Sequence, residues 1–403
     1  MSIKIIANRG ISAPAGFEAA GLACGIKAGG KEDLGLVLSK TPAAVAAAFT
    51  TNKVVAASVE ACRENLEEKA RAVIVNSGNA NACVGRQGLE DAWSMIDLTA
   101  GTFELDPHET LVASTGIIGR PLPMAAVKDG IAALKPEHGR EADAAFSRAI
   151  ITTDAFPKQL AIEVALTGGT VVIGGAAKGA GMIAPDMAPH ATMLAFVTTD
   201  APLAAAQLNE HLTATLKKTF NAITVDGDMS TNDSIFAFAN GAAGDFEFTE
   251  GDRRAFQEGL DYLCLQLAKM IVRDGEGATK VITYKVVGAK SADEAEQTAR
   301  TVADSLLVKT AFFGRDPNWG RLLAAVGRSG AELDPDDLDI DIGGLPLVRS
   351  GKAAETDTAE VAERMKSDEI EVWINLNRGG YRKTIYGCDL GYDYVKINAE
   401  YHT

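Results

Sequence analysis

Cysteine and histidine are both scarce in this chain, at five residues each among 403. The cysteines are odd in number, scattered, and form no Cys-x-x-Cys pair, which indicates reduced thiols and not a disulfide framework or a zinc site. The histidines lack the spacing of metal ligands. We therefore expect no metal site.

Long apolar runs and basic runs are missing as well. No run of eighteen apolar residues occurs, and the first residues have neither the apolar stretch nor the cleavage site of a signal peptide. The net charge is −15, and no run of five basic residues offsets it. We expect a cytoplasmic protein with neither a nucleic-acid nor a membrane partner.

The residues that are present predict a mixed α/β fold. At 403 residues, 47% of them hydrophobic, the chain is long enough for two or more packed layers or domains. The β-branched runs predict strands over 72–76, 170–173, 193–198, 223–225, 281–287, 370–376 and 394–397. Amphipathic periodicity predicts helices over 89–103, 124–134, 203–220, 253–272 and 292–312, and the stripe along 253–272 faces a core.

The segment from Gly174 to Asp200 has two interpretations. It opens with a glycine-rich turn bearing Lys178, and such turns often cradle phosphates, yet no P-loop or dinucleotide motif is complete here. The second interpretation concerns Ala191 and Thr192, a small residue and a hydroxyl residue before an apolar strand. Cleavage between them would leave Thr192 with a free α-amine, which can serve as the base that activates its own hydroxyl. An ordinary strand threonine is the simpler alternative.

Two further segments carry candidate chemistry. Residues 112–121 contain Thr115 and Gly116 in a Ser-Thr-Gly turn, which is either a cap or a place that presents a hydroxyl and a backbone N–H to an oxyanion. Residues 273–280 place Glu276 between two glycines after a long helix. One interpretation is structural, with Gly275 as a helix C-cap. The other is that the loop holds the Glu276 carboxylate toward a substrate ammonium.

Ten stretches, in order along nearly the whole chain, resemble one family, the ArgJ family of ornithine acetyltransferases, also called glutamate N-acetyltransferases. They are GISAPAGF from Gly10, AAFTTNKVVAA from Ala47, VIVNSGNANAC from Val73, VASTGIIG from Val112, KGAGMIAP from Lys178, TMLAF from Thr192, VDGDMSTND from Val225, DGEGATK from Asp274, DPNWGRLLAAVGR from Asp316 and INAEYHT from Ile397.

The resemblance implies a fold and a processing event. The family has the four-layer α/β/β/α fold of DmpA-type aminopeptidases, with mixed sheets and an N-terminal nucleophile. Its members cut themselves into two chains that assemble as an α2β2 heterotetramer. By residue match, the α chain is Met1–Ala191 and the β chain is Thr192–Thr403.

The resemblance also implies site residues. Thr115 and Gly116 match the oxyanion-stabilising pair, and Thr192 matches the nucleophile. The substrate-binding positions match Thr152 or Thr153, Lys178, Thr192, Glu276, Asn398 and Thr403.

Two positions depart from the family pattern. Three additional residues precede Thr192, where the family usually reads Met-Ala-Thr-Met-Leu, and this puts the cleavage rate and the pocket shape in question. Ala155 stands where the family often has a threonine.

The activity implied is transfer of an acetyl group from N-acetylornithine to glutamate through an acetyl-threonine enzyme, with no cofactor and with acetyl-CoA as an open second donor. A related N-terminal-nucleophile aminopeptidase or amidase is the alternative, in which water takes the acyl group. A non-enzymatic scaffold would instead keep an intact chain.

Overall fold

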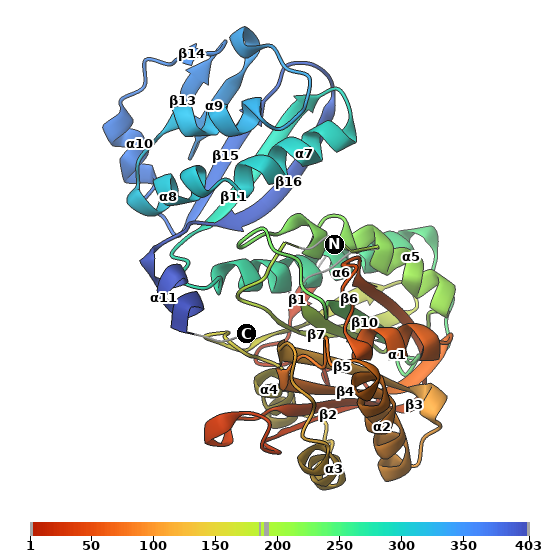
Figure 1. Cartoon of the computed structure of the whole chain (residues 1–403). Helices are drawn as coiled ribbons and strands as arrows, with labels where there is room; N and C mark the ends of the chain where they lie inside the picture. The colour runs from red at the N-terminus through yellow and green to blue at the C-terminus, as the bar shows by residue number, and fades with distance from the viewer. Residues whose placement is uncertain (1–2, 185–186, 189–192, 401–403) are drawn as a thin grey trace. The chain divides into compact units, whose positions relative to one another are not determined.

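The computed structural model describes residues 3–184, 187–188 and 193–400, with only the backbone described at 187–188. The chain divides into two compact units, each considered by itself. Unit 1 comprises Met1–Asn221, Asp228–Ile271 and Thr403, and unit 2 comprises Ala222–Gly227 and Val272–His402. Both contain helices and a mixed sheet (Figure 1), so the predicted mixed α/β class is confirmed.

Unit 1 is built on a ten-stranded sheet that runs in the order β1-β6-β7-β9-β10-β3-β4-β5, with β2 and β8 also paired to β3. Its strands are β1 (Ile3–Ile5), β2 (Phe17–Leu22), β3 (Leu34–Thr50), β4 (Lys69–Asn79), β5 (Thr110–Ile117), β6 (Lys158–Leu166), β7 (Gly169–Lys178), β8 (Met187–Ala188), β9 (Leu194–Thr199) and β10 (Ser234–Ala239). The β4–β5 and β9–β10 pairs are parallel and the others antiparallel.

The helices of unit 1 lie on two outer sides of this sheet. They are α1 (Ala57–Asn65), α2 (Arg86–Phe103), α3 (Met124–Ala133), α4 (Arg140–Ala149), α5 (Ala205–Leu216) and α6 (Glu250–Arg273, to Ile271 in this unit). Helices α1 and α2 contact β5, whereas α5 contacts β3 and β10. Figure 1 shows α2 and α3 on the side of unit 1 away from α5 and α6. The long strand β3 joins the two parts of the sheet, giving the expected helix–sheet–sheet–helix order.

An aromatic cluster joins helix α4 to strands β9 and β10. The rings of Phe196 and Phe236 stack with their centroids 5.7 Å apart, and Phe146 meets Phe196 edge-on at 5.2 Å. All three side chains are buried among the aliphatic residues of β3, β4 and β5. On the outer side, Leu263 and Leu267 of α6 are fully buried, which confirms the predicted core-facing stripe.

Unit 2 is a six-stranded mixed sheet whose helices pack over its apolar core. The strand order is β14-β13-β12-β15-β11-β16. The strands are β11 (Val281–Ala289), β12 (Asp339–Ile342), β13 (Leu345–Arg349), β14 (Lys352–Ala353), β15 (Glu369–Asn375) and β16 (Tyr381–Cys388). The helices are α7 (Ala292–Ala303), α8 (Leu306–Gly314), α9 (Trp319–Gly327), α10 (Thr358–Arg364) and α11 (Tyr392–Glu400). Strands β11 and β15 are paired in parallel, and the other pairs among the described strands of this sheet are antiparallel.

Three predicted elements differ from the structure. Residues 394–397 lie in helix α11 and not in a strand, because a short β-branched run does not distinguish the two. Residues 223–225 form no strand, and only Ile223 makes an isolated bridge, to Tyr386. The predicted helix over 292–312 is two helices, since Ser305 caps a new one by accepting a hydrogen bond from the Val308 N–H.

Candidate active site

The candidate oxyanion pair lies on β5, beside its parallel neighbour β4. Gly116 pairs with Gly78, and the register shifts there because Asn79 faces both Thr115 and Ile117, which is a β-bulge. Gly116 has φ of 133°, and a Cβ on it would lie 2.3 Å from the Gly78 carbonyl carbon. No other residue fits at that approach. The predicted turn at Thr115–Gly116 is therefore a bulged strand.

Lys178 reaches this bulge from the last residue of β7. Its Nζ donates to Thr115 Oγ1 at 3.3 Å, and both side chains are only 8% exposed. A hydroxyl has a single hydrogen, so Thr115 accepts from the ammonium with its oxygen and keeps its own O–H for another acceptor. This is the arrangement that an oxyanion donor requires.

The glycines before Lys178 serve packing and not phosphate binding. Gly174 and Gly175 lie inside β7, where a turn had been predicted. A Cβ on Gly174 would lie 2.3 Å from the Gly10 carbonyl oxygen, and one on Gly175 would lie 2.9 Å from Leu263 and Leu267. The backbone of β7 is paired on both edges, so it offers no cradle of open N–H groups.

A buried carboxylate joins the Thr152–Thr153 turn to β7. Asp154 accepts from the Thr152 N–H at 2.9 Å, the Gly179 N–H at 2.7 Å and Lys158 Nζ at 2.7 Å. The Asp154 and Lys158 side chains are fully buried. Thr152 and Thr153 themselves are half-buried, so a fixed backbone presents partly accessible side chains.

The carboxyl group of Asp154 stays ionised because of the groups around it. Burial alone would raise its pKa, but the charges of Lys178 and Lys158, together with the hydrogen bonds to its oxygens, outweigh burial and hold the pKa well below the ordinary range. Asp154 is therefore an anion at neutral pH that compensates two nearby ammonium groups. Sequence reasoning missed this residue, because a spacing of four pairs two charges only on a helix and residues 154–158 form none.

Ala191 and Thr192, the predicted cleavage site, and Thr403 lie outside the described residues. After the predicted cleavage site, β9 begins at Leu194, which pairs with Lys178 in the sheet. Met193 is also placed, since its carbonyl accepts from the Ser234 N–H at 2.9 Å. The last described residues before the predicted cleavage site, Met187 and Ala188, pair with β3, whereas β9 after it pairs with Lys178, the residue that contacts Thr115.

In unit 2, Glu276 and Asn398 contact each other. Asn398 Nδ2 donates to Glu276 Oε2 at 2.7 Å, and Glu276 is 9% exposed. The loop approaches α11 closely at Gly277, which has φ of 71° and whose Cβ would lie 2.6 Å from the Tyr394 nitrogen. The positive φ expected of a C-cap glycine is therefore at Gly277 and not at Gly275.

Asp389, at the end of β16, holds the other side of the Glu276 loop. It accepts from the Thr279 N–H at 2.8 Å, Thr279 Oγ1 at 2.5 Å and the Lys280 N–H at 3.0 Å. A carboxylate that receives three hydrogen bonds fixes the backbone two residues beyond Gly277. Sequence reasoning gave no reason to single out Asp389.

Comparison with known proteins agrees with the motifs. The model of the ArgJ family matches residues 18–403. The chain belongs to the ArgJ family. A relative from Symbiobacterium thermophilum, the arginine biosynthesis bifunctional protein ArgJ, is 49% identical over 403 residues, with 98% of each chain covered. A glutamate N-acetyltransferase from Methanocaldococcus jannaschii is 46% identical over 415 residues, which cover 99% of this chain and all of the relative.

Two solved structures of ArgJ-type proteins are also similar. The arginine biosynthesis bifunctional protein ArgJ from Bacillus halodurans is 42% identical, with a TM-score of 0.45, covering 46% of this chain and 98% of that one. The ornithine acetyltransferase from Mycobacterium tuberculosis, solved with ornithine, is 40% identical with a TM-score of 0.44, covering 46% of this chain and 100% of that one.

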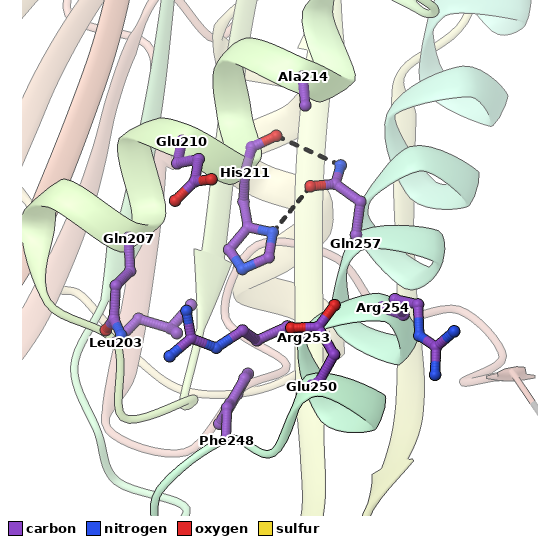
Figure 2. A pocket seen from close by; sticks show the side chains of 10 residues that line it. All are labelled: Leu203, Gln207, Glu210, His211, Ala214, Phe248, Glu250, Arg253, Arg254 and Gln257. Atoms are coloured by element: carbon purple, nitrogen blue, oxygen red, sulfur yellow. Dashed lines mark hydrogen bonds between the residues drawn. The ribbon is translucent and has the colours of Figure 1, made fainter.

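A pocket in this ArgJ-family chain lies between α5 and α6, apart from the predicted site residues (Figure 2). Its volume is about 240 Å³, and it contains none of the predicted site residues. His211 on its wall is oriented by a 2.7 Å hydrogen bond between its Nδ1 and Gln257 Oε1. The surrounding charged side chains of Glu210 and Arg253 are exposed to solvent.

Two further observations apply to the described residues. None of their His, Cys, Asp and Glu side chains gather in a group of three that could hold a metal ion. No helix among them combines the length and apolar character needed to cross a membrane. All five cysteines are free thiols.

We expect Asp389→Asn to destabilise unit 2 around the Glu276 loop. The amide keeps one acceptor oxygen but turns an NH2 toward donors, which costs about 1–3 kcal/mol for buried groups. The measurement is the melting curve, with Asp368→Asn as a control because Asp368 is exposed. Equal melting temperatures for the two variants would contradict the assigned role of Asp389.

Proposed function

We propose that this chain transfers an acetyl group from N-acetylornithine to glutamate through an ester on Thr192, after self-cleavage between Ala191 and Thr192. The single observation that carries the proposal is the contact between Lys178 and Thr115 beside the Gly78–Gly116 bulge. Family membership and a relative named glutamate N-acetyltransferase support it.

The first half-reaction forms the ester. Thr192 Oγ attacks the acetyl carbonyl carbon, and its proton passes to its own α-amine, whose ordinary pKa of about 7.7–8.0 suits a base near neutral pH. Thr115 Oγ1–H and the Gly116 N–H donate to the developing oxyanion. The bond from the acetyl carbon to the ornithine nitrogen then breaks, the leaving nitrogen takes the proton, and ornithine departs.

The second half-reaction returns the threonine. The α-amine of glutamate attacks the ester carbon, the bond to Thr192 Oγ breaks, and that oxygen regains a proton. This is covalent catalysis in two steps and needs no cofactor. Acetyl-CoA is a second donor in this proposal, because its thioester carbonyl can form the same ester on Thr192.

Substrate contacts follow from the charges available. We assign the α-carboxylate of the substrate to Lys178 and its ammonium group to Glu276, a carboxylate that already holds an amide donor. Thr152 or Thr153, Asn398 and Thr403 supply polar contacts. We propose that the processed chains form an α2β2 heterotetramer in the cytoplasm.

The test is an assay of purified protein with each donor in turn. N-Acetylornithine with glutamate is expected to yield N-acetylglutamate and ornithine in equal amounts. Acetyl-CoA with glutamate tests the second donor separately. Release of free acetate in place of N-acetylglutamate would identify a hydrolase and overturn the proposal.

The processing proposal predicts two bands of roughly half of 42.2 kDa each on a denaturing gel. The reason is that an N-terminal threonine exists only after the bond between Ala191 and Thr192 is cut. Mass spectrometry would identify chains 1–191 and 192–403. A chain that stays whole on long incubation, yet transfers acetyl groups, would show that cleavage does not create the base.

A further inference from the structure

Lys27 connects two segments of the candidate site that are distant in the sequence. Its stem crosses Gly78, since a Cβ on that glycine would lie 2.8 Å from Lys27 Cγ. Its Nζ donates to the carbonyl oxygens of Ile151 at 2.6 Å and Glu32 at 2.7 Å. Ile151 immediately precedes Thr152. One side chain therefore contacts both the bulge strand and the substrate-binding turn.

The loop that presents Lys27 is itself held in place. Asp33, which is fully buried, accepts from the backbone N–H groups of Cys24 at 2.7 Å, Gly25 at 3.1 Å and Lys27 at 2.8 Å. A carboxylate that accepts from three backbone donors of one loop restricts the conformation of that loop. Lys27 is thus directed at Ile151 from a fixed backbone.

The peptide group between Ile151 and Thr152, whose carbonyl oxygen accepts from Lys27, is held through its N–H as well. The Asp154 carboxylate accepts from the Thr152 and Gly179 N–H groups, as described above. The peptide group that leads into Thr152 and Thr153 is therefore held through both of its polar atoms, the oxygen by an ammonium and the N–H by a carboxylate. A site held this closely binds its ligand with little loss of conformational freedom.

We propose that Lys27 is a further positioning residue of the substrate site, which fixes the Thr152–Thr153 turn beside the Gly78–Gly116 bulge and adds a second positive charge to that of Lys178 for the carboxylate of an amino-acid substrate. The inference rests on the proposed function, since it deepens the account of the same site.

The charge of Lys27 depends on pH in the physiological range. Its pKa is lowered to about 8, chiefly by burial and also by the charges of Lys178 and Lys31, while the charges of Asp33 and Asp154 act to raise it. The ammonium is therefore present below about pH 8, where both carbonyls receive a charged donor. Above that pH the amine is neutral, so the positive charge is lost and the two hydrogen bonds weaken.

Three variants test this proposal. Lys27→Met keeps the length of the stem over Gly78 but removes the ammonium, Lys27→Arg keeps the charge, and Lys31→Met changes an exposed lysine of the same loop as a control. For Lys27→Met we expect the KM for N-acetylornithine and the calorimetric Kd for ornithine at pH 7 to rise about ten- to a hundredfold, the loss expected for a charged hydrogen bond. Lys27→Arg should restore most of the loss, and the control should stay within about twofold of the parent.

The pH dependence of the KM for N-acetylornithine distinguishes a positioning role of Lys27 from a merely structural one. In the parent, the KM for N-acetylornithine should rise above about pH 8. In Lys27→Arg that rise should be absent, because an arginine stays charged. The comparison needs only charged variants, so it decides the matter even if Lys27→Met fails to fold. An equal alkaline rise in both proteins, or a folded Lys27→Met with KM and Kd within about twofold of the parent, overturns the proposal.

Failure of the proposed function gives a different result. If the parent transfers no acetyl group to glutamate, the activity is wrong, while the ornithine Kd of the parent and of Lys27→Met still decides whether Lys27 supports amino-acid binding. If the parent transfers acetyl normally and Lys27→Met matches it, only the Lys27 inference is wrong.

Discussion

Replacing Thr192 with alanine is expected to abolish both chain cleavage and acetyl transfer. The same hydroxyl attacks the Ala191 carbonyl during processing and the acetyl carbonyl during turnover, and alanine has no atom that replaces it. Thr192→Ser should retain part of each activity, because the hydroxyl and, after cleavage, the α-amine are both kept. Gel analysis and initial rates with N-acetylornithine and glutamate are the measurements.

The outcomes of that experiment distinguish Thr192 from any other residue as the nucleophile. An alanine variant that stays whole and inactive supports the assignment. Near-normal turnover by Thr192→Ala would mean that another residue is the nucleophile. A melting curve of the whole-chain variant is needed beside the rates, so that loss of activity is not confused with loss of fold.

Thr115→Ala is expected to lower kcat about a hundred- to a thousandfold, or about 2.7–4 kcal/mol, with a much smaller change in KM. The hydroxyl donates to an oxyanion that exists only in the transition state, so its loss affects turnover more than substrate binding. The 3.3 Å contact with Lys178 Nζ gives the physical basis, because it commits the Thr115 oxygen as an acceptor and leaves the O–H to donate.

The control for this prediction is in the same strand. Thr110 is fully buried in β5 and donates to the Asp106 carbonyl at 3.4 Å, away from the bulge. Thr110→Ala should cost about 1 kcal/mol of stability with little effect on kcat. Thr115→Ser should keep most of the rate. A folded and fully processed Thr115→Ala enzyme with kcat within about threefold of the parent would leave the Gly116 N–H as the remaining donor, contrary to the expected range.

Periodic patterns in the sequence predicted the elements that bury one continuous face. The stripe along α6, including Leu263 and Leu267, is buried as expected, because a period of three and four residues specifies which side of a helix is apolar. Helix α11 shows the limit of such reasoning. Its YDYVKIN run has no fully buried residue, so no burial pattern marks it as a helix.

Motif order predicted the family, and with it the site residues. The structure brings Thr115 and Lys178 into contact, and separately Glu276 and Asn398. The roles of all these residues, the cut between Ala191 and Thr192 and the division into chains 1–191 and 192–403 remain predictions. The glycines before Lys178 were misinterpreted as a turn, because composition alone does not distinguish a flexible loop from a crowded strand.

The sequence by itself therefore determined the mixed α/β class, the positions of several helices and strands, and membership of the ArgJ family, all of which depend on local spacing and on motifs read in order. Only the tertiary structure decided that Gly116 meets Gly78, that Asp154 joins the Thr152 turn to Gly179, and that Lys27 reaches Ile151. The physical reason is that each of these contacts joins segments far apart in the chain. Pairing of β4 with β5 brings Gly78 beside Gly116, and pairing of β6 with β7 brings the Thr152 turn beside Gly179.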